Sequence, residues 1–367
     1  MSLIYSMKRF LLALIALLTV PVAFANKGEE NHKEEAFNVG KMITEHVTDA
    51  HEWHLWGGHH DAVSVYLPII LIDNGLQVFS SKSFYHSEAQ VAYEKDSVSE
   101  HYFVDETGKY GLFKETIYTV KDGGLQFNEK GECINETPWD FSITKNTLSL
   151  FFGAIIIMML LFTTARYYKK NGAVAPKGMA KFMEPMILMI RDLALENIGE
   201  KKYKKYIPYL ATIFFFIWIN NMLGIVPIIP GGANLTGSIS VTFILAIFTL
   251  IATLFSSNKN YWGHIFMPPG VPIALLPIMI PIEIIGIFTK PFALMIRLFA
   301  NMTAGHVIVL ALISIIFINK SVAWGGLSVP MSLFISILEI LVAFLQGYLF
   351  ALLSALFIGN AVEEAHH

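Results

Sequence analysis

Long apolar stretches follow one another from Asn146 to the end of the chain, separated by shorter polar segments. Each stretch is long enough to cross a bilayer as a helix, so the pattern predicts an all-α polytopic membrane region with about five membrane-crossing helices. The last two stretches exceed what a perpendicular helix needs, and we expect long, tilted helices that form a hairpin. Pro277, Pro281 and Pro291 are available kink sites in the first of these two. The five predicted spans are Leu148 to Thr164, Tyr209 to Val226, Ile239 to Phe255, Val271 to Ile318 and Val329 to Ile358.

The segment between the first and second spans has a different pattern. From Lys177 to Ile198, apolar residues recur at helical spacing and charged residues interrupt them. This pattern predicts an amphipathic helix that lies on the membrane surface. A helix packed against a soluble partner fits the same pattern equally well. The apolar positions are Phe182, Met183, Met186, Ile187, Ile190 and Leu193, and the charged ones are Lys181, Glu184, Arg191, Asp192 and Glu196.

Residues 26–140 are more polar than the rest of the chain and carry strand and turn signals. Ala62 to Asp73 is rich in Val, Ile and Tyr, and Asn74-Gly75 separates it from the run Leu76 to Ser80. Asn-Gly between two apolar runs is a strong hairpin signal. A second, weaker turn signal lies at Lys121 to Gly124, directly before Leu125. We therefore predict a small β-containing domain over residues 26–140, followed by a membrane domain over residues 141–367, and expect a loop at Ser256 to Gly263.

The first 25 residues have the three parts of a secretory signal peptide. Lys8 and Arg9 precede the apolar run Phe10 to Val20, and Ala23-Phe24-Ala25 supplies a small-residue end. The apolar run is shorter than the roughly 20 residues that a span needs, which favours a signal peptide over residues 1–25, cleaved near Ala25. An uncleaved first transmembrane helix is the alternative. A signal peptide places the domain of residues 26–140 outside the cytoplasmic membrane.

Loop charge gives a second orientation signal. Ten Lys and Arg residues lie between Arg166 and Lys205, in the segment that joins the first two spans, whereas Pro227 to Ser238 contains none. Positive loops mark the cytoplasmic side. Five spans then run from an outside N-terminus to a cytoplasmic C-terminus, as the signal peptide also requires. Both signals indicate a multi-pass protein of a bacterial inner membrane with a periplasmic N-terminal domain.

Composition agrees with this class and excludes others. The chain of 367 residues is 54% hydrophobic and only 15% charged, which is typical of a multi-span membrane protein. Its formal net charge of -3 gives no support to a nucleic-acid partner. The single cysteine, Cys133, excludes an internal disulfide framework and a cysteine metal cluster.

Histidines are concentrated near the N-terminus, where eight of the 12 lie between His32 and His101. A subset with a neighbouring carboxylate could bind zinc or copper, since imidazole suits both metals. No regular ligand spacing supports this reading, so we interpret the segment as solvated and predict neither a metal nor a cofactor. The subset is His46, His51, His54, His59 and His60 with Asp61.

Arg297 lies in the middle of the fourth apolar stretch. A guanidinium keeps its proton in a protein, and a charge at the centre of a membrane helix costs about 2.5–3.5 kcal/mol on insertion scales. Such residues usually face a bundle interior, a charged partner or a water-filled path. The polar residues within the spans are few: Asn220, Asn221, Glu283, Arg297, Asn301, His306, Glu339 and Gln346.

Helix geometry predicts how these residues lie relative to one another. Glu283 lies about 21 Å from Arg297 along the helix axis, towards the cytoplasm, and roughly 40° away around it. His306 lies about 13 Å beyond Arg297 and about 180° round, so the two side chains look in different directions. On the last helix Glu339 and Gln346 share a face, with Glu339 near His306 in depth and Gln346 nearer Arg297. We expect an aqueous inlet at His306 and Glu339 and a second route past Glu283, separated by a fixed positive charge.

Each residue also has a simpler interpretation. A lone histidine in a helix is more often a satisfied core residue, and Glu339 alone could be a structural hydrogen-bond anchor. His306 and Glu339 lie at matching depth, and Arg297 lies between this pair and Glu283. Packing alone does not readily explain this arrangement. The pattern therefore favours an ion path.

Arg297-Leu298-Phe299-Ala300-Asn301-Met302, followed by Ala304-Gly305-His306, resembles the signature of subunit a of the F-type ATP synthase. The resemblance covers about Phe141 to Glu364, and the Arg297 motif is highly specific. It does not explain the long N-terminal domain, because the family's N-terminal segment is usually short. A docking or assembly role outside the membrane is our hypothesis for that domain. Further matching features are Lys290-Pro291, Asn221 before Gly224 and Pro227, Asn234-Leu235-Thr236, and the pair Glu339 and Gln346.

The resemblance implies a proton-translocating stator beside a rotating ring of c subunits, each with a membrane-embedded carboxylate. Arg297 matches the essential arginine that faces the ring and separates two offset half-channels. His306 and Glu339 match the outer half-channel pair, which in some members is Glu then His. Glu283 matches an inner half-channel carboxylate. Asn301 and Gln346 match polar residues near the arginine.

The resemblance also implies partners: the c ring, the subunit b stalk and the rest of the ATP synthase complex, within membrane lipid. The chain itself has no phosphate-binding loop of the G-x-x-x-x-G-K-[ST] type, so we expect no nucleotide site and no enzymatic activity in it. A self-contained ion-coupled secondary transporter is the alternative function, but it predicts paired internal repeats, which are not evident between the spans. A purely structural scaffold would leave Arg297, His306 and Glu339 unexplained.

Overall fold

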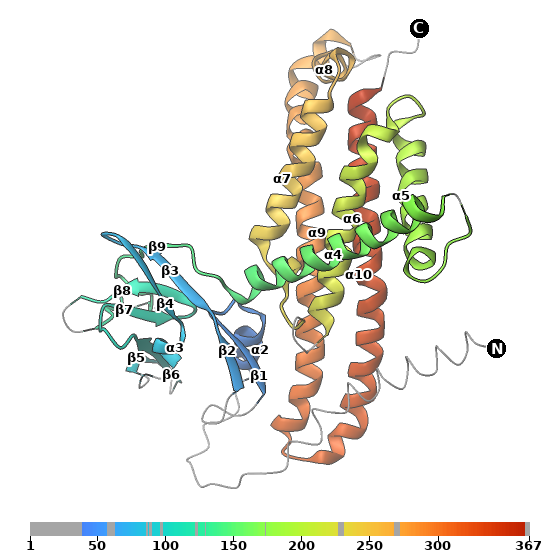
Figure 1. Cartoon of the computed structure of the whole chain (residues 1–367). Coiled ribbons are helices and arrows are strands. Elements are labelled where there is room, and N and C mark those ends of the chain that lie inside the picture. The colour runs from blue at the N-terminus through green and yellow to red at the C-terminus, as the bar shows by residue number, and fades with distance from the viewer. Residues whose placement is uncertain are drawn as a thin grey trace. The chain divides into compact units, whose positions relative to one another are not determined.

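The computed structural model describes most of the chain from Val39 to Glu363. The described residues are 39–56, 63–85, 87, 90–95, 98–121, 124–128, 130–172, 174–226, 231–267 and 272–363 (Figure 1). The predicted signal peptide, residues 1–25, lies outside them, and so do His59, His60 and Asp61. Among the described residues, no group of three or more His, Cys, Asp or Glu side chains is arranged to hold a metal ion.

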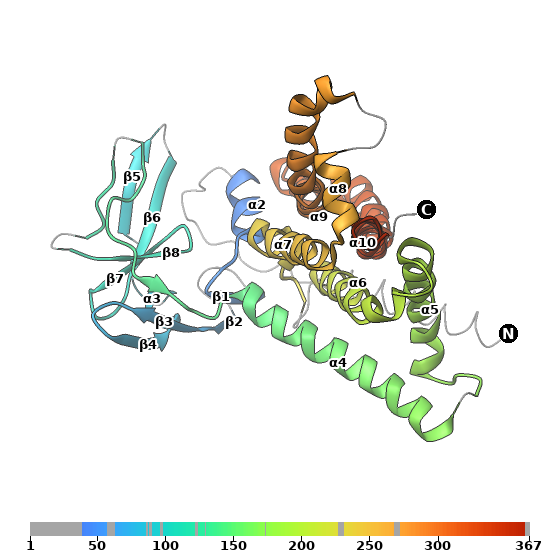
Figure 2. The same cartoon turned by 90° about the horizontal axis from the view of Figure 1, so that it is seen from above.

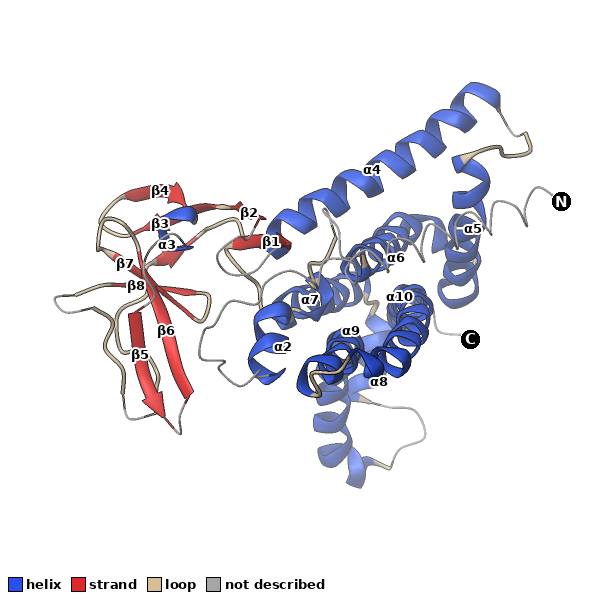
Figure 3. Cartoon of the chain, turned by 90° about the horizontal axis from the view of Figure 1, so that it is seen from below, coloured by secondary structure: helices blue, strands red, loops and turns tan. Residues whose placement is uncertain are grey.

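The region from Val39 to Asp140 contains small antiparallel sheets (Figure 3). One sheet pairs β1 with β2, a second has the order β4-β3-β9, and a third has the order β5-β6-β7-β8. The predicted β-containing character of this region is confirmed. Its elements are α2 Val39–Val47, β1 Glu52–Trp56, β2 Val63–Tyr66, β3 Pro68–Ile72, β4 Leu76–Ser80, α3 Lys82–Tyr85, β5 Gln90–Lys95, β6 Val98–Val104, β7 Tyr110–Phe113, β8 Thr116–Thr119 and β9 Trp139–Asp140.

The predicted Asn-Gly hairpin joins β3 to β4. Ile72 pairs with Leu76 at the closed end, and Asn74 and Gly75 between them both have positive φ, a conformation that Gly and Asn adopt more readily than other residues. Alternation along β3 buries Ile69 and Leu71 and leaves the intervening side chains more exposed. These two residues form a buried cluster with Phe84, Tyr110, Leu112 and Ile117.

Helices make up the chain from Lys145 onward. Five of them are long and apolar enough to cross a membrane, counted over the described residues, which confirms the predicted number. Side-chain capping by Thr144 and a positive-φ Gly172 mark the two ends of the first. The helical elements are α4 Lys145–Asn171, α5 Met179–Ile198, α6 Tyr203–Ile225, η2 Leu235–Gly237, α7 Ile239–Ser256, α8 Lys259–Phe266, η3 Ile273–Leu275, α9 Leu276–Ile318, η4 Val322–Trp324 and α10 Gly325–Val362.

The loop prediction for Ser256 to Gly263 is wrong in part, because α8 begins at Lys259. This short helix buries Ile265 and stacks Trp262 on Phe266, with ring centroids 6.2 Å apart. A helix of eight residues is too short to give a clear periodicity in the sequence.

Two long helices, α9 and α10, contact each other and are joined by the short segment that contains η4. Pro281 and Pro291 both lie inside α9, which continues as one helix of 43 residues. Helix α6 packs against α10, and α4 runs across α6 rather than alongside it (Figures 1 and 2). At the crossing, the amide of Asn220 packs so closely on Gly153 of α4 that a side chain at position 153 would overlap it.

The apolar side of α5 packs against α6 and α10 of the same chain. Met183, Ile190 and Leu193 are buried there, whereas Phe182 is about half exposed. The predicted helical periodicity of this segment is thus present, and its buried side is covered by helices of this chain. Its position on a membrane surface stays a prediction.

Candidate functional site

Arg297 lies on a side of α9 that no other part of the described chain covers. Its side chain and that of Asn301, one helical turn later, are both exposed. No carboxylate among the described residues forms an ion pair with Arg297. A permanent charge on a membrane helix is costly when the described part of the chain supplies no counter-charge. We therefore expect a partner of opposite charge from another chain.

The neighbours of Arg297 on the same side of α9 are small or apolar. Ala293, Ala300 and Ala304 are exposed, and small residues allow the backbone of another helix to approach closely. Large exposed apolar residues extend the same surface in both directions. They include Ile282 and Ile308.

His306 of α9 and Glu339 of α10 form a buried pair. The Nδ1 atom of His306 lies 3.2 Å from Oε1 of Glu339, and both side chains are about nine-tenths buried. Gly305 makes this approach possible, because a Cβ atom at that position would overlap the carboxylate of Glu339. The structure therefore brings together the two residues that helix geometry placed at the same depth.

The other nitrogen of His306 faces α6. Its Nε2 atom lies 3.3 Å from the backbone carbonyl oxygen of Gly224. A carbonyl can only accept a hydrogen bond, so Nε2 carries a proton there and Nδ1 is the nitrogen left to exchange a proton with Glu339. Imidazole and carboxylate can then pass one proton between them, which is the chemistry of a relay.

The remaining predicted residues lie apart from this pair. Gln346 is buried on α10, seven residues beyond Glu339 and on the same side of the helix. Glu283 is half-buried near the start of α9. Burial and the nearby charge of Glu283 raise the pKa of Tyr261 on α8. The described contacts join neither Glu283 nor Gln346 to Arg297, so the structure does not gather all predicted site residues in one place.

Two glycines of the site were not predicted as site residues. Gly305 provides space for Glu339, and Gly224 provides the carbonyl acceptor for His306. Both belong to motifs that the sequence already displays, and a glycine directly before a membrane histidine is the signal that could have revealed Gly305. Gly224 is 82 residues from His306, and no local pattern connects them.

A second polar cluster surrounds His51 in the β-containing region. His51 is buried, with Nδ1 3.5 Å from Oε2 of Glu115 and Nε2 3.5 Å from Oδ2 of Asp140. Burial opposes the charged ring, but hydrogen bonds and charges from Asp140 and Glu115 outweigh it and raise the pKa of His51 to about 9. Burial also opposes the charge of Asp140, yet hydrogen bonds from His51 and Ser142 lower its pKa. The cluster is thus an imidazolium held between two carboxylates.

This cluster predicts a pH-dependent stability of the β-containing region. Because the pKa of His51 is raised on folding, its contribution is complete below about pH 6.5 and is lost as pH rises through about 9. The loss is at most about 3.5 kcal/mol, at about 1.4 kcal/mol for each pKa unit. Hydrogen exchange of the β3 and β7 amides in the full chain in lipid nanodiscs, corrected for intrinsic rates, should show weaker protection at pH 9. The variant H51Q should lose this pH dependence, whereas H101Q should keep it.

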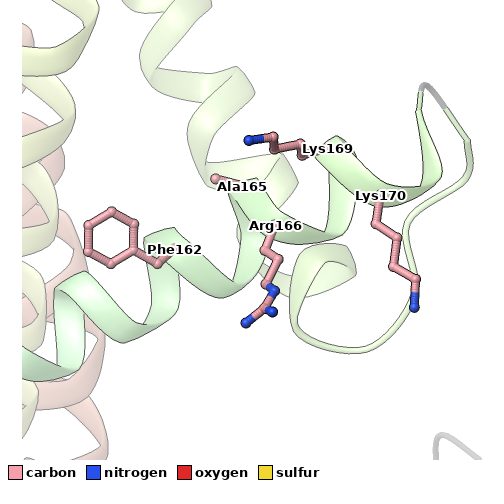
Figure 4. Close-up of a pocket in the computed structure, with 5 residues that line it drawn as sticks. All are labelled: Phe162, Ala165, Arg166, Lys169 and Lys170. Atoms are coloured by element: carbon pink, nitrogen blue, oxygen red, sulfur yellow. The ribbon is translucent and has the colours of Figure 1, made fainter.

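The end of α4 carries a shallow, basic hollow that is separate from the site (Figure 4). No predicted site residue lines it. Basic side chains next to an exposed aromatic ring are typical of the end of a span at the lipid headgroups. The hollow is lined by Phe162, Ala165, Arg166, Lys169 and Lys170.

Comparison with known proteins shows two matches to protein families. The sequence model described as ATP synthase A chain matches residues 147–359, and one described as a domain of unknown function (DUF8433) matches residues 42–141. The chain is 48% identical over 243 residues to ATP synthase subunit a 2 of Chlorobium luteolum, covering 62% of this chain and 70% of that protein. It is 45% identical over 236 residues to ATP synthase subunit a of Chloroherpeton thalassium, covering 62% and 69%. For ATP synthase subunit a of Myxococcus xanthus the identity is 43% over 235 residues, covering 62% and 75%.

Proposed function

Because this chain belongs to the ATP synthase A chain family, and is a multi-pass membrane protein that assembles with the rest of the ATP synthase complex, we propose that it is the proton-translocating stator of that complex. Two offset half-channels lead to and from the carboxylate of a rotating c ring, and Arg297 separates them. The observation that carries this proposal is the exposed guanidinium of Arg297, which forms no ion pair with a carboxylate of the described residues and lies on a side of α9 with small neighbours. An alternative reading, a structural scaffold, gives such a charge no purpose.

The role of Arg297 follows from its fixed charge. An opposite charge at close range favours the ionised form of a carboxylate, so a ring carboxylate that passes Arg297 gives up its proton. Since a guanidinium does not release its own proton, it cannot relay protons between the two half-channels. Asn301 and Gln346 are the polar residues proposed to act beside it.

His306 and Glu339 are proposed as the outer half-channel pair, and Glu283 as the inner half-channel carboxylate. The buried contact between His306 and Glu339 supports the first assignment, because a relay needs its two groups within hydrogen-bond reach. The half-exposure of Glu283 and the effect of its charge on Tyr261 of α8 support the second, since a carboxylate that takes up and releases protons has to be accessible.

The proposed orientation has the β-containing domain of residues 26–140 in the periplasm and the C-terminus in the cytoplasm of a bacterial cell. Ten positive residues between the first two spans and the signal-peptide pattern of residues 1–25 support it. The c ring and the subunit b stalk are the proposed neighbours within the complex. Chemistry on nucleotides is assigned to other subunits, because this chain lacks the phosphate-binding loop motif.

Reconstitution of the chain alone distinguishes a stator from a self-contained transporter. In liposomes with an imposed pH gradient, the isolated chain should conduct few protons, because the ring carboxylate that completes the path is missing. The same liposomes with the complete complex should acidify on addition of ATP, as a pH-sensitive dye would report. Gradient-driven transport by the isolated chain at the rate of the complex would instead identify a transporter.

A further inference from the structure

One side of the β4-β3-β9 sheet consists of apolar residues. Phe141 continues the pairing directly after β9, since its backbone N–H donates to the carbonyl oxygen of Ile70 at 2.9 Å. Residues directly opposite each other in neighbouring strands point to the same side of a sheet, and so do residues two positions apart in one strand. The pairing therefore places six side chains together, which we call the apolar sheet face: Leu76, Ile72 and Trp139 in one row, and Val78, Ile70 and Phe141 in the next.

The apolar sheet face is exposed. Ile72 is 47% exposed and Trp139 is 74% exposed, whereas Ile69 and Leu71, on the opposite side of β3, are completely buried. Within residues 39–144, the described chain exposes seven large apolar side chains, and five of them belong to this one face. A contiguous patch of this kind usually marks a contact with a protein or a membrane. The described chain supplies nothing that covers it.

A buried contact on the other side of the sheet fixes the two aromatic rings in this direction. Asp140 lies between Trp139 and Phe141, and its Oδ2 atom is 3.5 Å from Nε2 of the buried His51. Successive side chains of an extended strand point to opposite sides. Because Asp140 is held inward by His51, Trp139 and Phe141 both point outward.

Helix α4 keeps the apolar sheet face close to the membrane. Phe141 precedes Lys145, the first residue of α4, by four positions, which an extended chain bridges in at most about 14 Å. The apolar run of α4 begins at Leu148, only about 4.5 Å further along the helix axis. The first turn is also bonded to the domain, since the backbone N–H of Asn146 donates to Oδ1 of Asp49 at 2.9 Å. The sheet is thus held next to the end of a membrane-spanning helix.

The chemistry of the apolar sheet face fits lipid better than another protein. None of its six residues is charged, and only the indole N–H of Trp139 can form a side-chain hydrogen bond, whereas protein interfaces typically contain many hydrogen bonds. Tryptophan is enriched at the membrane–water boundary, where its ring contacts apolar groups and its N–H contacts headgroups. The strands β5 and β6 of the same domain differ, because they carry Glu94, Lys95 and Glu100.

We propose that the apolar sheet face docks on the phospholipid leaflet at which α4 enters the membrane, with Trp139 and Phe141 among the headgroups. Burial of these side chains in the lipid removes apolar surface from water, which is favourable. The contact does not select anionic lipids, because the face contains no basic residue. The proposal requires only that α4 spans the membrane, so it is independent of the stator function. It gives the β-containing domain a second attachment to the membrane besides α4.

The test measures how close the face lies to lipid headgroups in the complete complex. The complex is reconstituted in phosphatidylcholine liposomes with or without a phosphatidylcholine that carries a nitroxide quencher on its headgroup. Cys133 is the only cysteine of the chain, so C133S provides a background without thiols in this subunit and corrects for labels on other subunits. In that background, V78C labelled with the fluorophore NBD should lose most of its fluorescence in the nitroxide liposomes. The control E106C, at an exposed position between β6 and β7, should lose little.

A further pair of substitutions tests the cause of the quenching. Adding L76E and W139E to V78C places two carboxylates on the face, and the quenching at position 78 should then weaken, because charged groups resist transfer into lipid. If immunoblotting shows that V78C does not assemble, L76C gives the same readout from the neighbouring row, with W139E alone as the added substitution.

Equal quenching at positions 78 and 106 would overturn the proposal. The emission maximum of NBD at position 78 would then identify what replaces it. A maximum as in water would show that the face is bare, and a blue-shifted maximum without quenching would show that another protein covers it. Neither result would affect the stator function, which is tested by proton pumping.

Discussion

Replacing Arg297 with alanine is expected to abolish ATP-driven proton pumping by the assembled complex. Without the guanidinium, the ring carboxylate loses an opposite charge that lowers its pKa by about 1 to 3 units. The ratio of its ionised to its protonated form at that position then falls by roughly 10- to 1000-fold, and the carboxylate no longer releases its proton on passing. The loss should appear as absent quenching of a pH-sensitive dye in inverted membrane vesicles, together with a faster passive proton leak.

Two matched variants make the result specific. R166A removes an arginine at the far end of α4, outside the proposed path, and should pump like the unmodified complex. R297K keeps a positive charge but not the guanidinium fork, so it separates the need for charge from the need for geometry. Normal pumping by R297A, with the complex intact by native gel, would contradict the proposed role of this residue.

Neutralising Glu339 as glutamine is expected to slow proton transport by about 100-fold, the lower range of what a positioned acid–base group contributes. Glutamine keeps the size of the side chain and the capacity to hydrogen-bond, but its amide cannot take up a proton. The initial rate of ATP-driven acidification in vesicles measures the effect. E363Q, at an exposed position directly after α10, is the control and should leave the rate unchanged.

An exchange of the two residues tests whether the pair acts as a unit. The double variant H306E/E339H restores one imidazole and one carboxylate in contact, so it should pump faster than either H306E or E339H alone. Non-additivity of this kind is expected for residues in direct contact. A double variant that is slower than both single variants would contradict this. It would show that the rate depends on having the imidazole at position 306 and the carboxylate at position 339, and not merely on having the two groups in contact.

The sequence predicted the membrane helices well because apolar length is a strong local signal. It placed the start of the first span at Leu148, whereas α4 begins at Lys145. Lys145 and Asn146 are polar, and what holds them in the helix is their bonding to Thr48, Asp49 and Ala50, far away in the sequence. Hydropathy contains no information on such contacts.

For the site too, local patterns were predicted correctly and contacts between distant elements were not. Helix periodicity along single helices predicted that Arg297 and His306 point in different directions and that Glu339 lies at the depth of His306. The structure has Arg297 exposed and His306 in contact with Glu339. Periodicity could not predict which element faces the second nitrogen of His306, because the packing of α6 against α9 decides that.

The length of α9 has a geometric consequence for rotation. Its 43 residues span about 65 Å, and large apolar residues are exposed from Ile278 to Ile318. That surface is about twice as long as a hydrocarbon core of about 30 Å is thick, so we expect α9 to tilt or to extend beyond the core. Glu283 and Arg297 lie about 21 Å apart along the helix, and a tilt turns part of that distance into a displacement in the membrane plane. In the proposed stator, the tilt of α9 therefore sets how far a ring carboxylate travels between loading and release.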